Sequence, residues 1–211
     1  MTAPVYLVAI VGGSASGKTR LAHTLARRLG PEQAYVIKED DYYVDAGNLP
    51  GFDPATFNFD EPASKDHNLL RAQLLSLKNG APVAAPQYDF TTHCRCANPV
   101  RCEPAPVIVV EGLHLLASQH LAGLFDLTVF VEACRDTRFR RRLARDIAER
   151  DRSPEFVRDQ FESLVEPMHI AHVEPQRDRA DIVIENMGAP DFKRLVEPVL
   201  ERLPETVQAG A

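Results

Sequence analysis

Tryptophan is absent from this chain of 211 residues, and cysteine, with four residues, is scarce. So few cysteines in a chain of this length do not make a disulfide framework, and we expect a protein of the reducing cytoplasm. Long apolar runs are also missing: the longest near the N-terminus, residues 5–11, is too short to span a bilayer, and no basic segment precedes it. We therefore expect a buried strand there rather than a signal peptide, and no membrane partner.

A surplus of positive charge is absent as well, because 24 Lys and Arg residues face 30 Asp and Glu residues, a formal net charge of −6. This balance argues against a nucleic-acid partner, so any basic site has to be local. Apolar residues make up 45% of the chain and charged residues 26%, which excludes a disordered or collagen-like protein. We expect residues 1–211 to form a single domain.

Segments of strand and helix character alternate along the chain, a pattern typical of an α/β fold with a parallel sheet. The expected strands are residues 5–11, 34–38, 107–110, 127–131 and 182–184. The expected helices are residues 17–29, 69–77, a helix from about 137, 154–172 with a break near Pro167, and 192–203 with a bend at Pro198. Two long irregular insertions, 41–66 and 82–106, interrupt the alternation, and loops of this length are usually functional.

A phosphate-binding motif follows the first expected strand. The pattern G-x-x-x-x-G-K-[ST] is matched in full by Gly12, Gly13, Ser14, Ala15, Ser16, Gly17, Lys18 and Thr19. Glycines let the backbone wrap phosphate groups, the helix N-terminus faces them, and Lys18 adds a positive charge. The motif predicts a three-layer α/β/α P-loop NTPase fold with a five-stranded, mostly parallel sheet, and a nucleoside triphosphate bound by residues 12–19.

Acidic residues follow two of the expected strands, at the sheet edge where ligands of open α/β sheets bind. Asp40 and Asp41 come after residues 34–38, and Glu111 comes after residues 107–110. Glu111 resembles the acid that holds Mg²⁺ in phosphate-loop enzymes, and Asp40 and Thr19 are candidate ligands of the same ion. Either Asp40 or Asp41 could accept the proton of an attacking hydroxyl, and their spacing alone does not choose between them.

Eight arginines are concentrated in residues 135–152. Three apolar side chains spaced four apart predict the buried stripe of a helix there: Phe139, Leu143 and Ile147. The arginines of a different face are Arg138, Arg142, Arg145 and, if the helix continues, Arg152. Three interpretations are open: a solvated helix with ion pairs to Asp146 and Glu149, a nucleic-acid site, or a lid over residues 140–160 that closes on ATP. The phosphate loop favours the lid.

Three of the four cysteines lie close to a histidine, within ten residues: His93, Cys94, Cys96 and Cys102. This grouping raises the question of a zinc site. The cysteine spacing lacks the C-x2-C pairs of structural zinc sites, so we expect free thiols here.

Further motifs occur along the chain in a fixed order: Glu39-Asp40-Asp41-Tyr42-Tyr43, Asn58-Phe59-Asp60, Pro86-Gln87-Tyr88-Asp89-Phe90-Thr91-Thr92-His93, Val110-Glu111-Gly112 and Arg141-Arg142-Leu143-Ala144-Arg145-Asp146-Ile147. Together with the phosphate loop they resemble the uridine–cytidine kinase family, which is related to phosphoribulokinase. The resemblance extends over residues 5–184, which is most of the chain.

The resemblance implies transfer of the γ-phosphate of ATP or GTP, with Mg²⁺, to the 5′-hydroxyl of uridine or cytidine, giving UMP or CMP. It implies that Asp40 is the catalytic base and that Lys18, Arg142 and Arg145 act on the transferring phosphoryl group. The substrate-binding residues implied by the resemblance are Tyr43, Asp60, Tyr88, His93, Arg142, Arg152 and Gln160. It also implies a homo-oligomer, a tetramer in this family.

Three single positions depart from the family pattern, and Gln176-Arg177-Asp178-Arg179 is a loose version of a basic run of the family. Glu39 stands where the family usually has Gln, Glu61 replaces a common His, and Asp151 occupies a position where Gly is usual. Two alternatives therefore stay open: a kinase of the same fold that acts on another hydroxyl acceptor, such as nicotinamide riboside or a sugar phosphate, and a nucleotide-binding switch without catalysis.

Overall fold

The computed structural model describes residues 4–54, 56–188 and 190–208. Its centre is a five-stranded sheet in the order β2-β7-β1-β8-β9, in which all pairings are parallel. The strands are β1 (Tyr6–Val11), β2 (Ala34–Lys38), β7 (Val107–Gly112), β8 (Leu127–Glu132) and β9 (Ile182–Glu185). They correspond to the five predicted strands, which confirms the predicted parallel sheet.

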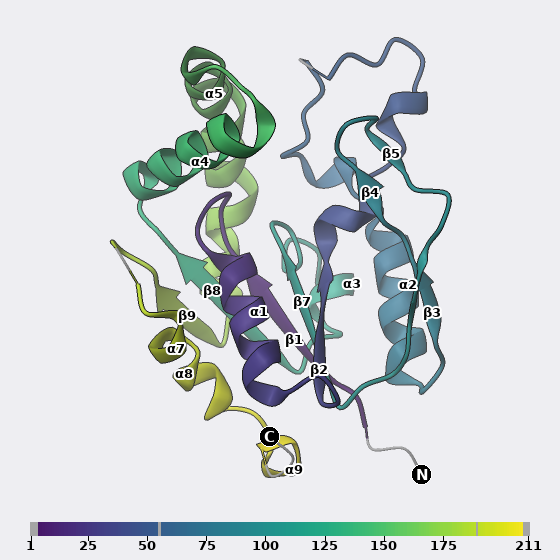
Figure 1. Cartoon of the computed structure of the whole chain (residues 1–211). Helices are drawn as coiled ribbons and strands as arrows, with labels where there is room; N and C mark the ends of the chain where they lie inside the picture. Colours follow the sequence, from purple (N-terminus) through teal and green to yellow (C-terminus); the bar gives the residue numbers. More distant parts are fainter. Residues whose placement is uncertain (1–3, 55, 189, 209–211) are drawn as a thin grey trace.

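Helices cover both faces of the sheet (Figure 1). One face packs against α1 (Lys18–Leu29) and the C-terminal helices α7 (Phe192–Leu195) and α8 (Glu197–Leu200), with α9 (Glu205–Gln208) beyond them. The other face packs against α2 (His67–Lys78) and α3 (Gln119–Ala122). Successive side chains of β1 point to opposite faces of the sheet, and helices cover both faces. Both sides of β1 are therefore buried. The predicted three-layer α/β/α fold is confirmed.

The first insertion follows the carboxyl end of β2, whereas the second lies between α2 and the amino end of β7 and extends to the carboxyl edge of the sheet (Figure 1). The first is a chain of turns with short 3₁₀ helices at Glu39–Tyr42, Ala46–Asn48 and Pro62–Ser64. The second is more regular than expected, because β3 (Val83–Ala85) pairs with β6 (Val100–Cys102) and β4 (Tyr88–Asp89) pairs with β5 (Cys94–Arg95). Strands of two or three residues are too short to show an alternating pattern in the sequence.

A long helical segment lies on the opposite side of the same edge. It contains α4 (Arg135–Arg150), α5 (Pro154–Gln160) and α6 (Glu166–Met168), with π-helical turns at Phe161–Val165 and His169–Val173 and a 3₁₀ helix at Glu174–Arg179. The predicted break near Pro167 is wrong. The wider π turns let the chain pass a proline, which donates no backbone hydrogen bond, without leaving helical geometry.

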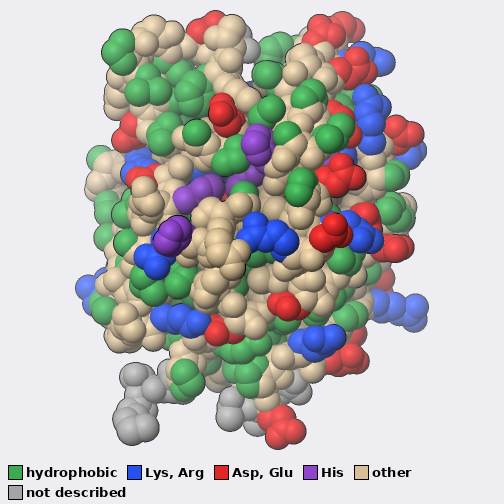
Figure 2. All heavy atoms as spheres, turned by 180° about the vertical axis from the view of Figure 1, so that it is seen from behind, with side chains coloured by type: hydrophobic (Ala, Val, Ile, Leu, Met, Phe, Trp, Pro, Cys, Tyr) green, Lys and Arg blue, Asp and Glu red, His purple; other side chains and the backbone are tan. Residues whose placement is uncertain are grey.

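The C-terminal segment bends as predicted, because α7 and α8 are separated at Val196, just before Pro198. Within the described ranges, no helix has the length and apolar character needed to cross a membrane. All four cysteines are free thiols. On the face drawn in Figure 2, acidic and basic side chains are interspersed, so that charge of one sign does not accumulate there.

Candidate active site

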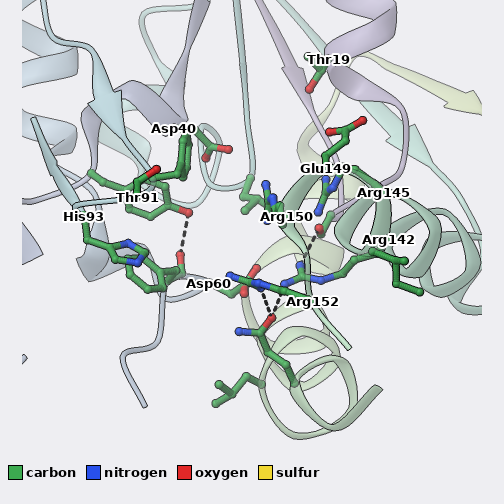
Figure 3. A pocket seen from close by; sticks show the side chains of 18 of the residues that line it. Thr19, Asp40, Asp60, Thr91, His93, Arg142, Arg145, Glu149, Arg150 and Arg152 are labelled. Carbon is green, nitrogen blue, oxygen red and sulfur yellow. Dashed lines mark hydrogen bonds between the residues drawn. The ribbon is translucent and has the colours of Figure 1, made fainter. Parts of the chain in front are cut away.

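A cavity of about 640 Å³ lies at the carboxyl edge of the sheet, between the insertions and helices α4 and α5. Its lining includes Ser14, Lys18 and Thr19 of the phosphate loop, Asp40, Tyr43, Asp60 and His93 from the insertion side, and Arg142, Arg145, Arg152 and Gln160 from the helical side. In Figure 3, the labelled acids Asp40 and Asp60 face the labelled arginines across the cavity. Acidic side chains of the insertion wall therefore face a helical wall that is rich in arginine and also carries Glu149 and Asp151.

The phosphate loop connects β1 to α1, and tertiary contacts hold it in shape. Ala15 and Gly17 have the left-handed φ angles of 61° and 99° that such a loop needs. A Cβ at Gly17 would collide with the side chain of Asn186, which follows β9 and donates a hydrogen bond of 2.6 Å to the Ser16 carbonyl. Asn186 thus helps to fix the loop backbone around the space expected for phosphates.

Oxygen ligands suited to Mg²⁺ lie beside this loop. Glu111, at the end of β7, is buried beside the Thr19 hydroxyl, and Asp40 lies on the cavity wall. Burial raises the pKa of Glu111, while nearby Lys18 and a hydrogen bond with Thr19 oppose that shift. Carboxylate and hydroxyl oxygens are the donors that Mg²⁺ prefers, so this set fits that ion. Glu111 itself is not among the cavity-lining residues.

The two candidate bases differ in position. Asp40 lines the cavity and its side chain is 42% exposed, whereas Asp41 does not line it and accepts a hydrogen bond of 3.4 Å from the backbone N–H of Tyr88. The surrounding protein partly desolvates Asp40, which favours a raised pKa, but Lys65 and Lys18 outweigh this effect and hold that pKa below its usual range. The geometry favours Asp40 over Asp41 as the group that meets a substrate.

Lys65 is a buried partner of Asp40 that the sequence analysis missed. Its ammonium group forms an ion pair with the Asp40 carboxylate and lies 3.5 Å from the centroid of the Tyr43 ring. In the sequence this lysine stands in a polar stretch after Pro62, where a solvated side chain is the ordinary expectation. Only the return of the insertion to the sheet edge brings it against Asp40.

Aromatic side chains form much of the insertion wall. His93 has a left-handed φ of 57° and stacks on Phe59 with ring centroids 4.8 Å apart. Burial, assisted by Arg152, lowers the pKa of His93, which keeps its imidazole neutral near pH 7. Phe57 and Phe90, which the sequence analysis did not assign to the site, also line the cavity. Flat apolar surface beside a neutral imidazole is suited to a planar heterocycle.

Of the other residues predicted to bind the substrate from this wall, two line the cavity and one does not. Tyr43 and Asp60 line the cavity, and the Tyr43 hydroxyl donates to the Phe59 carbonyl at 3.1 Å. Tyr88 does not line it: its ring packs 5.1 Å from the Tyr43 ring, and its hydroxyl is buried. Contact between Tyr88 and a substrate therefore stays a prediction, and in this structure Tyr88 supports Tyr43.

The arginines of α4 and its following loop converge with the phosphate loop. Arg142 donates to the Ser14 hydroxyl at 2.9 Å and to the Gln160 side-chain oxygen at 2.8 Å, and Arg152 donates to the same oxygen at 3.0 Å (Figure 3). Asp146 is fully buried among four arginines, the arginine cluster of Arg142, Arg145, Arg150 and Arg152. The cluster presents several positive groups to a space large enough for a triphosphate.

The predicted buried stripe of this helix is wrong. Phe139 and Leu143 are only half-buried and Ile147 is 42% exposed, while the buried face carries Arg138, Arg142 and Asp146. The hydrophobic pattern assumes that a helix packs on an apolar core. This helix instead packs on the phosphate loop and on the next helical segment, where Arg138 pairs with Glu166 at 2.8 Å.

The departures from the family pattern have distinct environments. Glu39 is fully buried and accepts hydrogen bonds from the backbone of Leu113 (2.6 Å) and His114 (3.2 Å). Burial alone would raise the pKa of Glu39, but a hydrogen bond with His67 and nearby positive charges hold it well below its usual range. Asp151 ends α4 with a φ of 51°, a left-handed conformation that explains why glycine suits this position.

Zinc is not supported at the cysteine loop. Cys94 and Cys102 are half-buried and Cys96 is exposed, and the described residues contain no group of three His, Cys, Asp or Glu side chains able to hold a metal ion. These three residues of the second insertion are free cysteines, and their lack of a metal role stays a prediction.

A phosphate loop at the carboxyl edge of a parallel sheet, opposed carboxylates and a converging arginine cluster define a P-loop kinase. A model of the Phosphoribulokinase / Uridine kinase family matches residues 7–193. The chain belongs to this family, and the resemblance inferred from its motifs is confirmed.

Relatives named uridine kinase match the chain over most of their length. A uridine kinase of Chloroflexus aurantiacus is 39% identical over 203 residues, covering 96% of this chain and 96% of that protein. A uridine kinase of Shewanella frigidimarina is 41% identical over 186 residues, covering 86% and 88%.

Solved structures confirm the fold at lower identity. Phosphoribulokinase from Rhodobacter spheroides superposes with a TM-score of 0.60 at 16% identity, covering 92% of this chain and 74% of that one. D-glycerate 3-kinase from Cryptococcus neoformans gives a TM-score of 0.66 at 15% identity, covering 90% and 87%. The acceptors of these enzymes differ, so the fold alone does not select one.

Proposed function

We propose that the chain transfers the γ-phosphate of ATP or GTP to the 5′-hydroxyl of uridine or cytidine, producing UMP or CMP. One observation carries the proposal: a single cavity joins Lys18 of the phosphate loop to Asp40 and Asp60 on one wall and to the arginine cluster on the other. The uridine kinases that share about 40% identity with nearly the whole chain support this choice of acceptor.

The reaction uses the two walls for different purposes. Asp60 accepts hydrogen bonds from the ribose 2′ and 3′ hydroxyls, and the aromatic wall with His93 holds the base. Asp40 accepts the proton of the 5′-hydroxyl as the new O–P bond forms and the bond between the γ-phosphorus and the bridging oxygen of ADP breaks. Lys18, Arg142 and Arg145 stabilise the charge on the transferring group.

Thr19, Glu111 and Asp40 would hold Mg²⁺ beside the phosphate loop. The ion, when bound, neutralises charge on the β and γ phosphates. Because the transition state of phosphoryl transfer is loose, the placement of Asp40 matters more than its strength as a base.

The first experiment is a coupled ADP-release assay with Mg-ATP and a panel of uridine, cytidine, adenosine, nicotinamide riboside and ribulose 5-phosphate. Release stimulated by uridine or cytidine alone is the expected result. A response only to another acceptor would replace the proposed substrate, and slow hydrolysis that no acceptor stimulates would favour a nucleotide switch.

Neighbouring carboxylates supply a matched pair of variants. Asp40→Asn should retain ATP binding and lower kcat by about 10²–10⁴-fold, the usual loss when a general base is removed. Asp41→Asn should retain most activity, because its amide oxygen can still accept the hydrogen bond from Tyr88. Near-wild-type turnover of Asp40→Asn would contradict its assignment as the base.

Self-association into a homotetramer is part of the proposal, supported by family resemblance. Light scattering of the purified chain during gel filtration checks it, and a monomer at micromolar concentration would contradict it.

A further inference from the structure

Lys65 is a charged side chain buried directly beneath the active-site cavity. Its side chain is fully buried and, unlike Lys18, it is not among the cavity-lining residues. Burying a lysine ammonium group is costly unless a partner compensates, and here the Asp40 carboxylate and the face of Tyr43 surround it. Two partners that compensate a buried charge in this way suggest that Lys65 has a role in the active site.

The backbone around Lys65 is held on both sides. Lys65 forms an antiparallel bridge with Tyr43, and its N–H donates to the Pro62 carbonyl at 3.1 Å. The next residue, Asp66, caps α2 by accepting a hydrogen bond of 2.9 Å from the N–H of Leu69. The ammonium group therefore approaches Asp40 from a fixed segment of chain.

We propose that Lys65 is a positioning residue, which holds the Asp40 carboxylate in the orientation that meets the acceptor hydroxyl and links it to the insertion that carries Asp60. The inference rests on the proposed function, because it assumes that Asp40 is the base. Lys65 does not line the cavity, so it acts through Asp40 rather than on a substrate.

Other charged groups around Asp40 do not replace Lys65. Lys18 also lies near Asp40, but it lines the cavity beside the phosphate loop, where bound phosphates compete for its charge. Glu39 and Glu111 are negative and repel the Asp40 carboxylate. Of the charged neighbours named here, Lys65 alone is both positive and shielded from ligand, so its ion pair persists when ATP binds.

The test is a double-mutant cycle of Lys65→Met and Asp40→Asn, measured as kcat and as the KM for ATP. Methionine is unbranched, apolar and similar in length, which suits a buried site. Lys65→Met should lower kcat by about 10²-fold, the cost of displacing a reacting group by about 1 Å, with the KM for ATP unchanged. In the Asp40→Asn background it should cause little further loss, because the residue acts through Asp40.

Lys78→Met is the matched control. Lys78, on α2, pairs with Asp126 at 2.8 Å away from the cavity, and its replacement should change kcat by less than about twofold. Lys65→Leu serves if the methionine variant does not fold, since it also removes both the charge and the hydrogen-bond donor.

Two results would overturn the inference: a kcat for the folded Lys65 variant within about twofold of wild type, or an equal further loss in the Asp40→Asn background. The cycle is run with whichever acceptor of the panel the wild type phosphorylates. A wrong acceptor would therefore contradict the proposed function while leaving the assignment of Lys65 to be decided by its own data.

Discussion

Replacing Asp146 by Asn removes the buried carboxylate at the centre of the arginine cluster. Its oxygens lie 2.8 Å from Arg145, 3.4 Å from Arg142, 3.5 Å from Arg150 and 3.8 Å from Arg152. Asparagine has nearly the same shape, so the change removes negative charge rather than volume. Four guanidinium groups then repel one another without a counter-ion between them.

The expected loss of stability depends on how exposed the four arginine partners of Asp146 are. Breaking a buried ion pair by removing one partner costs about 3–5 kcal/mol. The side chain of Arg142 is only 7% exposed, but those of the other three arginines are between 30% and 39% exposed and can be rehydrated. We therefore expect the low end of the range, about 3 kcal/mol, which for a domain of this size lowers Tm by about 6–12 °C.

Calorimetry of the variant without nucleotide, together with the coupled assay, checks this reasoning. Turnover should fall as well, because Arg142 and Arg145 lose the group that orients them. Asp136→Asn, in the first turn of the same helix, makes the same chemical change at an 80% exposed side chain and should lower stability by less than about 1 kcal/mol. A Tm for Asp146→Asn within 2 °C of the Asp136→Asn value would refute the assigned role of the buried carboxylate.

Three further predictions address other parts of the molecule. Gly17→Ala should abolish ATP binding in a titration, because a Cβ there meets Asn186 and the left-handed φ of 99° disfavours alanine. Burial, together with Arg138 and Lys18, lowers the pKa of His169 to about 4 in the folded protein. In the unfolded chain this histidine has its ordinary pKa of 6.5, so below pH 6.5 the unfolded state binds the proton more readily than the folded state does. Stability should therefore fall from pH 6.5 toward pH 4, and Tm should depend on pH less steeply in His169→Gln than in wild type. EDTA should abolish turnover and Mg²⁺ alone should restore it fully, whereas a requirement for added zinc would contradict the view of the cysteines as free thiols.

Much of the fold could be predicted because its signals are local. The buried strands read as short β-branched runs, and α1 ends at Leu29, which is the end predicted for the helix over residues 17–29. The prediction failed at Pro167 and along α4, where the outcome depends on what each helix packs against. A helix that rests on a phosphate loop and another helix can bury arginine and aspartate, which a hydrophobic pattern does not anticipate.

The candidate site also has parts that the sequence predicted and parts that only the tertiary structure shows. Residues 12–19 are contiguous, so one stretch of sequence determined the phosphate loop and, with the ordered motifs, the family. The placement of Asp40, and not Asp41, on the cavity wall, the ion pair with Lys65 twenty-five residues away, and the burial of Asp146 appear only in the tertiary structure. The physical reason is that the environment of a charged side chain is set by the partners and solvent around it, and folding brings those partners from distant parts of the chain.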